Sequence, residues 1–126
     1  MEKSTFDIGL QIRKDVVGAD YVERSLAAAD EFTRPIQELA TRYCWGEVWS
    51  RDGVDRRMRS VLNLGMLVAL NRPHELKLHL NGAFNNGLTI EEVRELLLQT
   101  AIYCGLPAAL DAFRIAKDVI REREAA

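Results

Sequence analysis

No long apolar run is present in the sequence. The longest, residues 61–70, has ten residues and includes Asn63, whereas a helix needs about 20 mostly apolar residues to cross a bilayer. The first five residues also lack the basic start and apolar block of a secretory signal. We therefore expect no membrane-spanning helix and a cytoplasmic location.

Histidine and cysteine are scarce. The two histidines, His74 and His79, are five residues apart and so do not share one face of a helix. The two cysteines, Cys44 and Cys104, are 60 residues apart, with no close pair of the kind that holds zinc or forms a redox couple. We expect no metal site, and we expect both thiols to be reduced and mostly buried.

A basic stripe is absent as well. Lysine and arginine, 17 in all, are interspersed with 19 acids and give a net charge of −2, so nucleic-acid binding is not expected. One local excess of arginine lies in residues 51–59, where four guanidinium groups accompany two carboxylates. It is either a solvated helix start or a site for an anionic small molecule. The four arginines are Arg51, Arg56, Arg57 and Arg59.

What is present is helix punctuation in a composition typical of a globular protein. With 48% hydrophobic and 29% charged residues, the 126 residues suit one domain, residues 1–126. Ser4 and Thr33 are placed to cap helices, and Thr89 with Glu92 forms a capping box. Gly18 is placed to stop the first helix. No run alternates like a strand, so we predict an all-α protein of six to seven helices.

The predicted helices follow from these signals and from the apolar spacing. The third helix is expected to end near Tyr43 or to continue to Trp49, with Ile36 and Leu39 on an apolar face. The fourth is apolar nearly all round in its second half, so it needs covering on every side. A chain of this length offers few helices to cover it, so we expect another subunit to do so and predict a homo-oligomer. The predicted ranges are 4–18, 20–30, 33–43 or 33–49, 54–70, 73–85, 89–105, and 107 onward.

His79 is the first candidate for chemistry. It falls between Leu76, Leu80 and Ala83, so it is expected to face inward or to lie at a subunit contact. Glu75 lies four residues earlier on the same helix face. The pair is either a carboxylate and an imidazole that share a proton, or a core histidine bonded to a backbone carbonyl.

Glu47 lies between Trp45 and Trp49 in sequence. A carboxylate walled by two indole rings is partly desolvated and suited to proton transfer near neutral pH. The alternative is an exposed glutamate beside two core tryptophans. Arg59 enters the apolar segment, where its guanidinium either grips a substrate carboxylate through two hydrogen bonds or forms a buried salt bridge.

Five blocks of the chain are similar to blocks of the carboxymuconolactone decarboxylase family. They are Glu-Phe-Thr-Arg at 31–34, Arg-Tyr-Cys-Trp-Gly-Glu-Val-Trp at 42–49, Arg-Met-Arg-Ser-Val at 57–61, Leu-His-Leu-Asn-Gly-Ala at 78–83 with Asn-Asn-Gly-Leu-Thr at 85–89, and Ala-Ile-Tyr-Cys-Gly-Leu-Pro-Ala-Ala at 101–109. The resemblance spans about residues 5 to 120. It implies an alkylhydroperoxidase D-like helical bundle that assembles into trimers or hexamers.

Thiol peroxidases of the wider family carry a Cys-x-x-Cys pair, whose second cysteine is four residues before a histidine. Counting back from His79, those two positions hold Arg72 and Glu75. The redox pair is absent, so peroxidase activity is not expected.

The resemblance implies cofactor-independent decarboxylation of 4-carboxymuconolactone to β-ketoadipate enol-lactone and carbon dioxide, in the breakdown of protocatechuate. It implies a catalytic His79 for proton delivery or for hydrogen bonding to the enolate, and Glu47 to orient it or share the proton. Charge logic adds Arg59, with Arg42 or Arg57, to bind this small dicarboxylate lactone. Trp45 and Trp49 would wall the pocket.

Two alternatives stay open at this point. The chain is either a thiol-independent relative that acts on another lactone or keto acid, or a non-catalytic binding or assembly protein in which Glu47 and His79 are structural polar groups. A substrate panel separates the first alternative from the predicted activity. A histidine titration separates the second.

Overall fold

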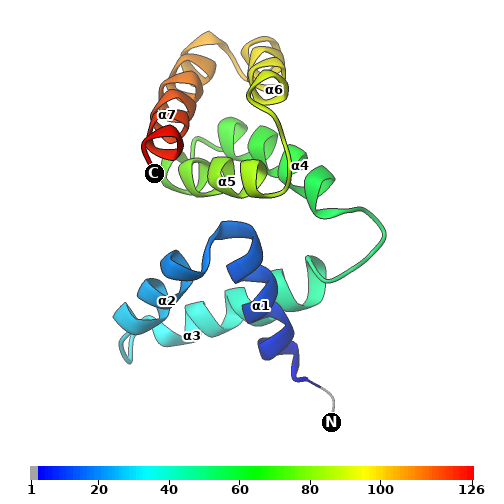
Figure 1. Ribbon diagram of the computed structural model, residues 1–126, viewed down its shortest axis with the longest axis vertical. Coiled ribbons are helices and arrows are strands. Elements are labelled where there is room, and N and C mark those ends of the chain that lie inside the picture. Colours follow the sequence, from blue (N-terminus) through cyan, green and yellow to red (C-terminus); the bar gives the residue numbers. More distant parts are fainter. Residues whose placement is uncertain (1–2) are drawn as a thin grey trace. The chain divides into compact units, whose positions relative to one another are not determined.

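Helices alone make up the regular structure of residues 3–126, the part of the chain that the computed structural model describes (Figure 1). The all-α prediction is confirmed, and no strand occurs among these residues. A π-helix, η1, directly continues α3, so the predicted third helix does reach almost to Trp49. The elements are α1 (Thr5–Val17), α2 (Ala19–Ala28), α3 (Arg34–Leu39), η1 (Ala40–Val48), α4 (Arg56–Ala69), α5 (Pro73–Asn85), α6 (Ile90–Tyr103) and α7 (Leu106–Ala125).

Several predicted helix ends are found with the expected chemistry. The Ser4 hydroxyl accepts a hydrogen bond from the Asp7 amide at the start of α1, and Gly18 ends that helix with a φ of 100°. Thr89 and Glu92 form both hydrogen bonds of the capping box at the start of α6. These caps satisfy amides that the first helical turn leaves without a backbone partner.

The prediction for the start of the third helix is wrong in two respects. Thr33 does not cap it, because its hydroxyl accepts from the Asp30 amide and donates to the Asp30 carboxylate instead. Thr33 and Asp30 thus close a local turn, which is the competing use of short polar side chains. The apolar face of α3 is also not buried, since Ile36 and Leu39 are exposed.

Contacts divide the chain into two compact units, which we describe separately. The first ends at Asp55, and the second comprises Arg56–Ala126. In the first unit α1 packs on η1, and the two backbones approach most closely at Gly9 and Gly46. A Cβ atom on Gly9 would overlap the Thr41 carbonyl oxygen, and one on Gly46 would overlap the Thr5 carbonyl oxygen. Glycine at both positions therefore permits this crossing.

Tryptophan and arginine complete the interior of the first unit. Trp45 and Trp49 are 5% and 6% exposed, and their ring centroids are 4.8 Å apart. Arg13 of α1 is also buried, and its guanidinium donates to the Thr41 hydroxyl of η1 over 3.1 Å. Burial lowers the pKa of Arg13 from its ordinary value, and the charges of Tyr21 and Cys44 oppose this shift. The hydrogen bond thus links α1 to η1, and the aromatic contact lies within η1 and its C-terminal end.

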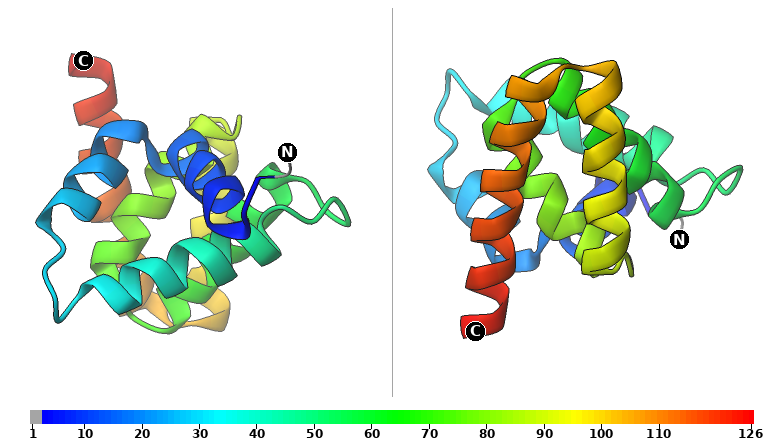
Figure 2. Two further views of the ribbon diagram at one scale, coloured as in Figure 1. Left: turned by 90° about the horizontal axis from the view of Figure 1, so that it is seen from below. Right: turned by 90° about the horizontal axis from the view of Figure 1, so that it is seen from above.

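The second unit is built from two packed helix pairs, α4 with α5 and α6 with α7 (Figures 1 and 2). Further contacts join α5 to α7 and α4 to α6. Arg123 of α7 donates to the side-chain oxygens of Asn81 and Asn85 on α5. The core of this unit consists of Leu64, Val68, Leu76, Leu80, Ala83, Leu88, Val93, Leu97, Ala112, Ala116 and Val119.

Large apolar side chains also remain on the surface. Phe32 is 90% exposed, and on α4 a row spaced four residues apart is exposed. That row, the α4 apolar row, consists of Met58, Leu62 and Met66 of α4 and Leu70 directly after it. No described helix combines the length and apolar character needed to span a bilayer. Both thiols are free, but Cys44 is exposed, so the expectation that it is mostly buried is wrong.

Candidate active site

The candidate site lies where α5 folds back on α4. Asn71 ends α4 with a φ of 56°, and the amides of Asn71 and Arg72 donate to the carbonyls of Val68 and Leu67. This pair of bonds is the Schellman arrangement, in which asparagine tolerates the left-handed conformation better than most residues. Pro73 then opens α5. The short turn makes α4 and α5 a helical hairpin and brings their central residues together.

Asn63 of α4 and His79 of α5 meet at the middle of this hairpin. The side-chain nitrogen of Asn63 lies 3.3 Å from Nδ1 of His79. Both residues are half-buried. The imidazole of α5 is therefore held by a side chain of α4, and not only by residues of its own helix.

Burial sets the protonation of His79. Desolvation lowers the pKa of His79 below its ordinary 6.5, and the charge of Glu75 opposes this shift without cancelling it. The imidazole is consequently neutral near pH 7. A neutral imidazole carries one N–H donor and one acceptor nitrogen, so His79 is suited to donate a hydrogen bond to an oxygen that becomes negative.

A second polar link joins the same two helices. The Asn86 amide, just after α5, donates to the buried Ser60 hydroxyl over 2.9 Å and to the Arg56 carbonyl over 3.3 Å. Polar contacts thus recur along the hairpin on both sides of the apolar core residues. They restrict the sliding of α5 along α4, which is what keeps His79 opposite Asn63.

The three predicted arginines have different surroundings. Arg59 is half-buried and lies four residues before Asn63, on the same face of α4. Arg57 is exposed and pairs with Glu92, a residue of the α6 capping box. Arg42 is exposed in the first unit, with its guanidinium 5.4 Å from the centre of the Tyr43 ring. Only Arg59 shares a helix face with the Asn63–His79 contact.

Glu47 belongs to the first unit, and of the two alternatives predicted for it the structure has the exposed glutamate beside two core tryptophans, not the carboxylate desolvated between indole rings. The Glu47 side chain is exposed, whereas Trp45 and Trp49 are buried and pack against each other. Residues four apart share one helix face and the residue midway between them lies on the opposite face, so the spacing of these three side chains accounts for the arrangement. Both tryptophans fall on the inner face, and Glu47 falls on the outer one.

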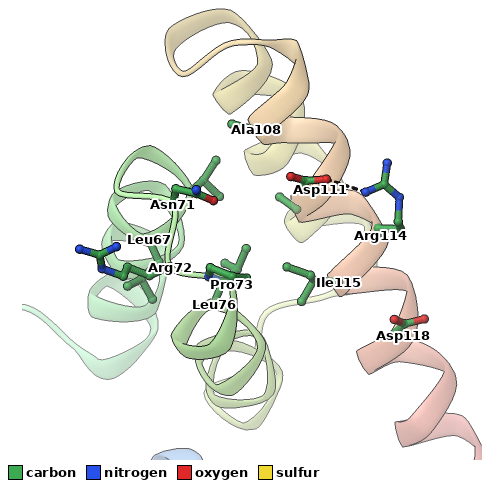
Figure 3. A pocket seen from close by; sticks show the side chains of 12 residues that line it. Leu67, Asn71, Arg72, Pro73, Leu76, Ala108, Asp111, Arg114, Ile115 and Asp118 are labelled. Atoms are coloured by element: carbon green, nitrogen blue, oxygen red, sulfur yellow. Dashed lines mark hydrogen bonds and ion pairs between the residues drawn. The ribbon is translucent and has the colours of Figure 1, made fainter.

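A pocket of about 210 Å³ at the α4–α5 turn is not this site (Figure 3). Figure 3 shows Arg72 on one side, with Asp111 and Asp118 of α7 on the other and Arg114 paired to Asp111. None of the predicted site residues lines it. Its two carboxylates are balanced by the guanidinium groups of Arg72 and Arg114, so its wall has no excess of positive charge to attract a dicarboxylic acid.

Asn63 is the site residue that the sequence analysis did not identify. The signal was present, because it is the lone amide within the apolar run of residues 61–70. A buried amide needs a hydrogen-bond partner, but which residue provides it depends on how α5 packs. Among residues 3–126, no three His, Cys, Asp or Glu side chains gather in a group that could hold a metal ion.

Comparison with known proteins identifies relatives over nearly the whole chain. A model of the Carboxymuconolactone decarboxylase family matches residues 34–118. A nitrosuccinic acid decarboxylase of Metarhizium robertsii is 45% identical over 122 residues, which are 97% of this chain and 85% of that protein. A 4-carboxymuconolactone decarboxylase of Acinetobacter baylyi is 40% identical over 121 residues, which are 96% of this chain and 90% of that protein. The two relatives are both decarboxylases, and their names give different acids.

Proposed function

The chain belongs to the carboxymuconolactone decarboxylase family, and we propose that it decarboxylates 4-carboxymuconolactone to β-ketoadipate enol-lactone in the breakdown of protocatechuate. The proposal is supported by the relative of that activity, which matches 96% of the chain. The structural observation that carries it is the half-buried, neutral imidazole of His79, held at Nδ1 by Asn63.

The chemistry of the substrate explains why the proposed reaction requires no cofactor. When the bond to the ring carboxylate breaks, its electron pair moves through the conjugated double bond onto the lactone carbonyl oxygen. The substrate therefore supplies its own electron sink, and carbon dioxide leaves. A proton added to the ring carbon next to the lactone carbonyl then completes the enol-lactone.

We assign His79 to the oxygen that becomes negative. A neutral imidazole is a weak acid but a good hydrogen-bond donor, and a donor in a partly desolvated position stabilises developing charge more than one in water. This assignment chooses between the two roles predicted for His79, because the lowered pKa leaves little imidazolium to deliver a proton near pH 7. Hydrogen bonding to the enolate is the role that we propose.

Glu47 is proposed as the residue that shares or delivers the proton. Its exposed carboxylate is accessible from solvent and so can be reprotonated between turnovers. For the carboxylates of the substrate we propose Arg59 first, because it lies on the α4 face that also carries Asn63. Arg42 and Arg57 would assist, although Arg57 would have to share its guanidinium with Glu92. Trp45 and Trp49, both buried, are proposed to wall the substrate pocket.

Nitrosuccinic acid is a second candidate substrate, because the relative that acts on it is 45% identical over 97% of the chain. It carries a nitro group on the carbon that bears one carboxylate. On loss of carbon dioxide, the electron pair moves onto a nitro oxygen. Both candidates are thus dicarboxylic acids. In each, the carbon that loses carbon dioxide is bonded to a group that can accept the electron pair on an oxygen atom, so the proposed role of His79 is the same for both.

We also propose that the chain works as a homo-oligomer. The α4 apolar row is exposed, and beside it an apolar groove of about 440 Å³ runs between α4 and α6, with Leu62, Met66 and Tyr103 among its lining residues. An apolar area of this extent is typical of a surface that another protein covers. A second copy of the chain is the partner that the family resemblance implies.

The test compares both acids on the same protein. Freshly generated 4-carboxymuconolactone is followed by ultraviolet absorbance with released carbon dioxide trapped, and nitrosuccinic acid is assayed by carbon dioxide release. We expect turnover of the lactone, and a loss of about 100-fold to 1,000-fold in His79→Gln, the usual effect of removing one hydrogen-bond donor to a developing oxyanion. His74→Gln is the matched control, since His74 is exposed on the same helix.

Three outcomes of this assay contradict the proposal. Turnover of nitrosuccinic acid alone would replace the substrate and retain the chemistry. Absence of acceleration with either acid, or an unchanged rate in His79→Gln, would remove the proposed activity or the proposed role of His79.

A further inference from the structure

The contact between Asn63 and His79 determines more than the position of the ring. The nitrogen of the Asn63 amide, which carries two hydrogens, faces Nδ1 of His79 at 3.3 Å. A neutral imidazole has one protonated and one unprotonated nitrogen. An amide N–H can donate only to the unprotonated one, so this contact requires the proton of His79 to be on Nε2.

We propose that Asn63 is a positioning residue that keeps His79 in the tautomer protonated at Nε2, so that Nε2–H is the donor offered to the oxygen of the substrate. The inference rests on the proposed function for its consequence in turnover, but the tautomer itself does not depend on a substrate. Asn63 would act only through His79 and would not contact the reacting atoms.

The surroundings make Asn63 suited to this role. It lies on α4 beside the buried Leu64, and His79 lies on α5 next to the buried Leu80, so the core holds both helices on either side of the contact. The Asn86 contact with Ser60 fixes the same hairpin farther along. With the backbones held, the side chain at position 63 selects which nitrogen of the ring carries the proton.

Asparagine and aspartate have nearly equal volumes, but at position 63 they would play opposite hydrogen-bonding roles toward Nδ1 of His79. A carboxylate only accepts hydrogen bonds, so Asn63→Asp would draw the proton to Nδ1 and leave Nε2 as an acceptor. The donor to the substrate oxygen would then be lost while the shape of the hairpin is kept. Asn81→Asp is the matched control, because it introduces the same charge on α5, where the amide of Asn81 bonds the Lys77 carbonyl.

The experiment is nitrogen-15 NMR on the full-length chain labelled in histidine, recorded at alkaline pH so that the rings are neutral. Long-range proton–nitrogen correlations distinguish the protonated from the unprotonated ring nitrogen. The signals of His79 are those that disappear in His79→Gln, and His74 is the internal reference. We expect Nε2–H in the wild type and in Asn81→Asp, and Nδ1–H in Asn63→Asp, together with a loss of turnover of about 100-fold or more in that variant.

Each result either supports or overturns the inference. Nδ1–H in the wild type would mean that the amide oxygen, rather than the nitrogen, faces the ring, and this result does not depend on whether Asn63→Asp folds. An unchanged tautomer in a folded Asn63→Asp would also overturn it. If neither acid is turned over but the tautomer switches, the proposed function fails and the positioning role at His79 stands.

Discussion

The close crossing of α1 and η1 predicts that Gly46→Ala destabilises the first unit. A Cβ atom at position 46 would overlap the Thr5 carbonyl oxygen and would come within 2.8 Å of the Thr5 Cγ2 atom. The overlapping oxygen belongs to the backbone, so no rotamer change can move it away. The two helices must separate instead, which weakens packing all along the crossing.

The size of the effect follows from two opposing contributions. Overpacking a close-packed site typically costs about 1–3 kcal/mol, and a collision with backbone belongs at the upper end of that range. Alanine gains back up to about 1 kcal/mol over glycine in a helix. The net loss is therefore about 2 kcal/mol, out of a total stability of about 5–15 kcal/mol for a small domain.

Tryptophan fluorescence during urea unfolding measures this loss, because both tryptophans of the chain, Trp45 and Trp49, are buried in the first unit. With a slope near 2 kcal/mol per molar urea, the midpoint should fall by about 1 M. Gly53→Ala is the control, since nothing lies within 4 Å of a Cβ atom there. Because Gly9 faces the same crossing, Gly9→Ala combined with Gly46→Ala should cost less than the sum of the two. An unchanged midpoint in Gly46→Ala would refute the reasoning.

Three further predictions concern the second unit. Thr89→Ala should cost about 1 kcal/mol in urea unfolding, because it removes half of the α6 capping box. The free energy of unfolding should fall as the pH drops below 6.5, because the folded pKa of His79 is lowered and the unfolded chain takes up that proton first. His79→Gln should remove this part of the loss in urea titrations between about pH 5 and 8. Leu62→Glu should dissociate the proposed homo-oligomer in sedimentation velocity, because an exposed apolar side chain of the α4 apolar row would carry charge into the contact.

Each of these predictions has a result that contradicts it. Equal midpoints for the wild type and Thr89→Ala would mean that the cap contributes nothing. A pH dependence that His79→Gln leaves unchanged would assign the loss to carboxylates, among them Glu92, whose pKa its hydrogen bond with Arg57 lowers. For the oligomer, Lys117→Gln changes the net charge by the same amount at an exposed position of α7. Equal sedimentation of the wild type, Leu62→Glu and Lys117→Gln would exclude α4 from the contact.

Most of the fold was predictable because helix signals are local. The Ser4 cap, the stop at Gly18 and the capping box at Thr89 all act within one helical turn, and the structure has each of them. Thr33 was the exception. A threonine three residues after an aspartate can either cap the next helix or bond back to that aspartate, and the sequence does not decide between the two. The division into one domain stays a prediction.

The candidate site was less predictable, because its geometry depends on contacts between helices. His79 was expected inside and is half-buried, but the partner of its Nδ1 was not foreseen. The exposure of Glu47 beside two buried tryptophans is one of the two alternatives that the sequence left open. The structure decided between them, because it shows which face of this helix is covered.

The sequence by itself determined the helical class, most helix ends and, through its five motif blocks, the family resemblance that the family match confirms. These properties depend on neighbouring residues or on residue order. The tertiary structure alone decided that Asn63 holds His79 and that glycine is required where α1 crosses η1. Both depend on atoms brought together from distant parts of the chain, and that closeness exists only once the helices have packed.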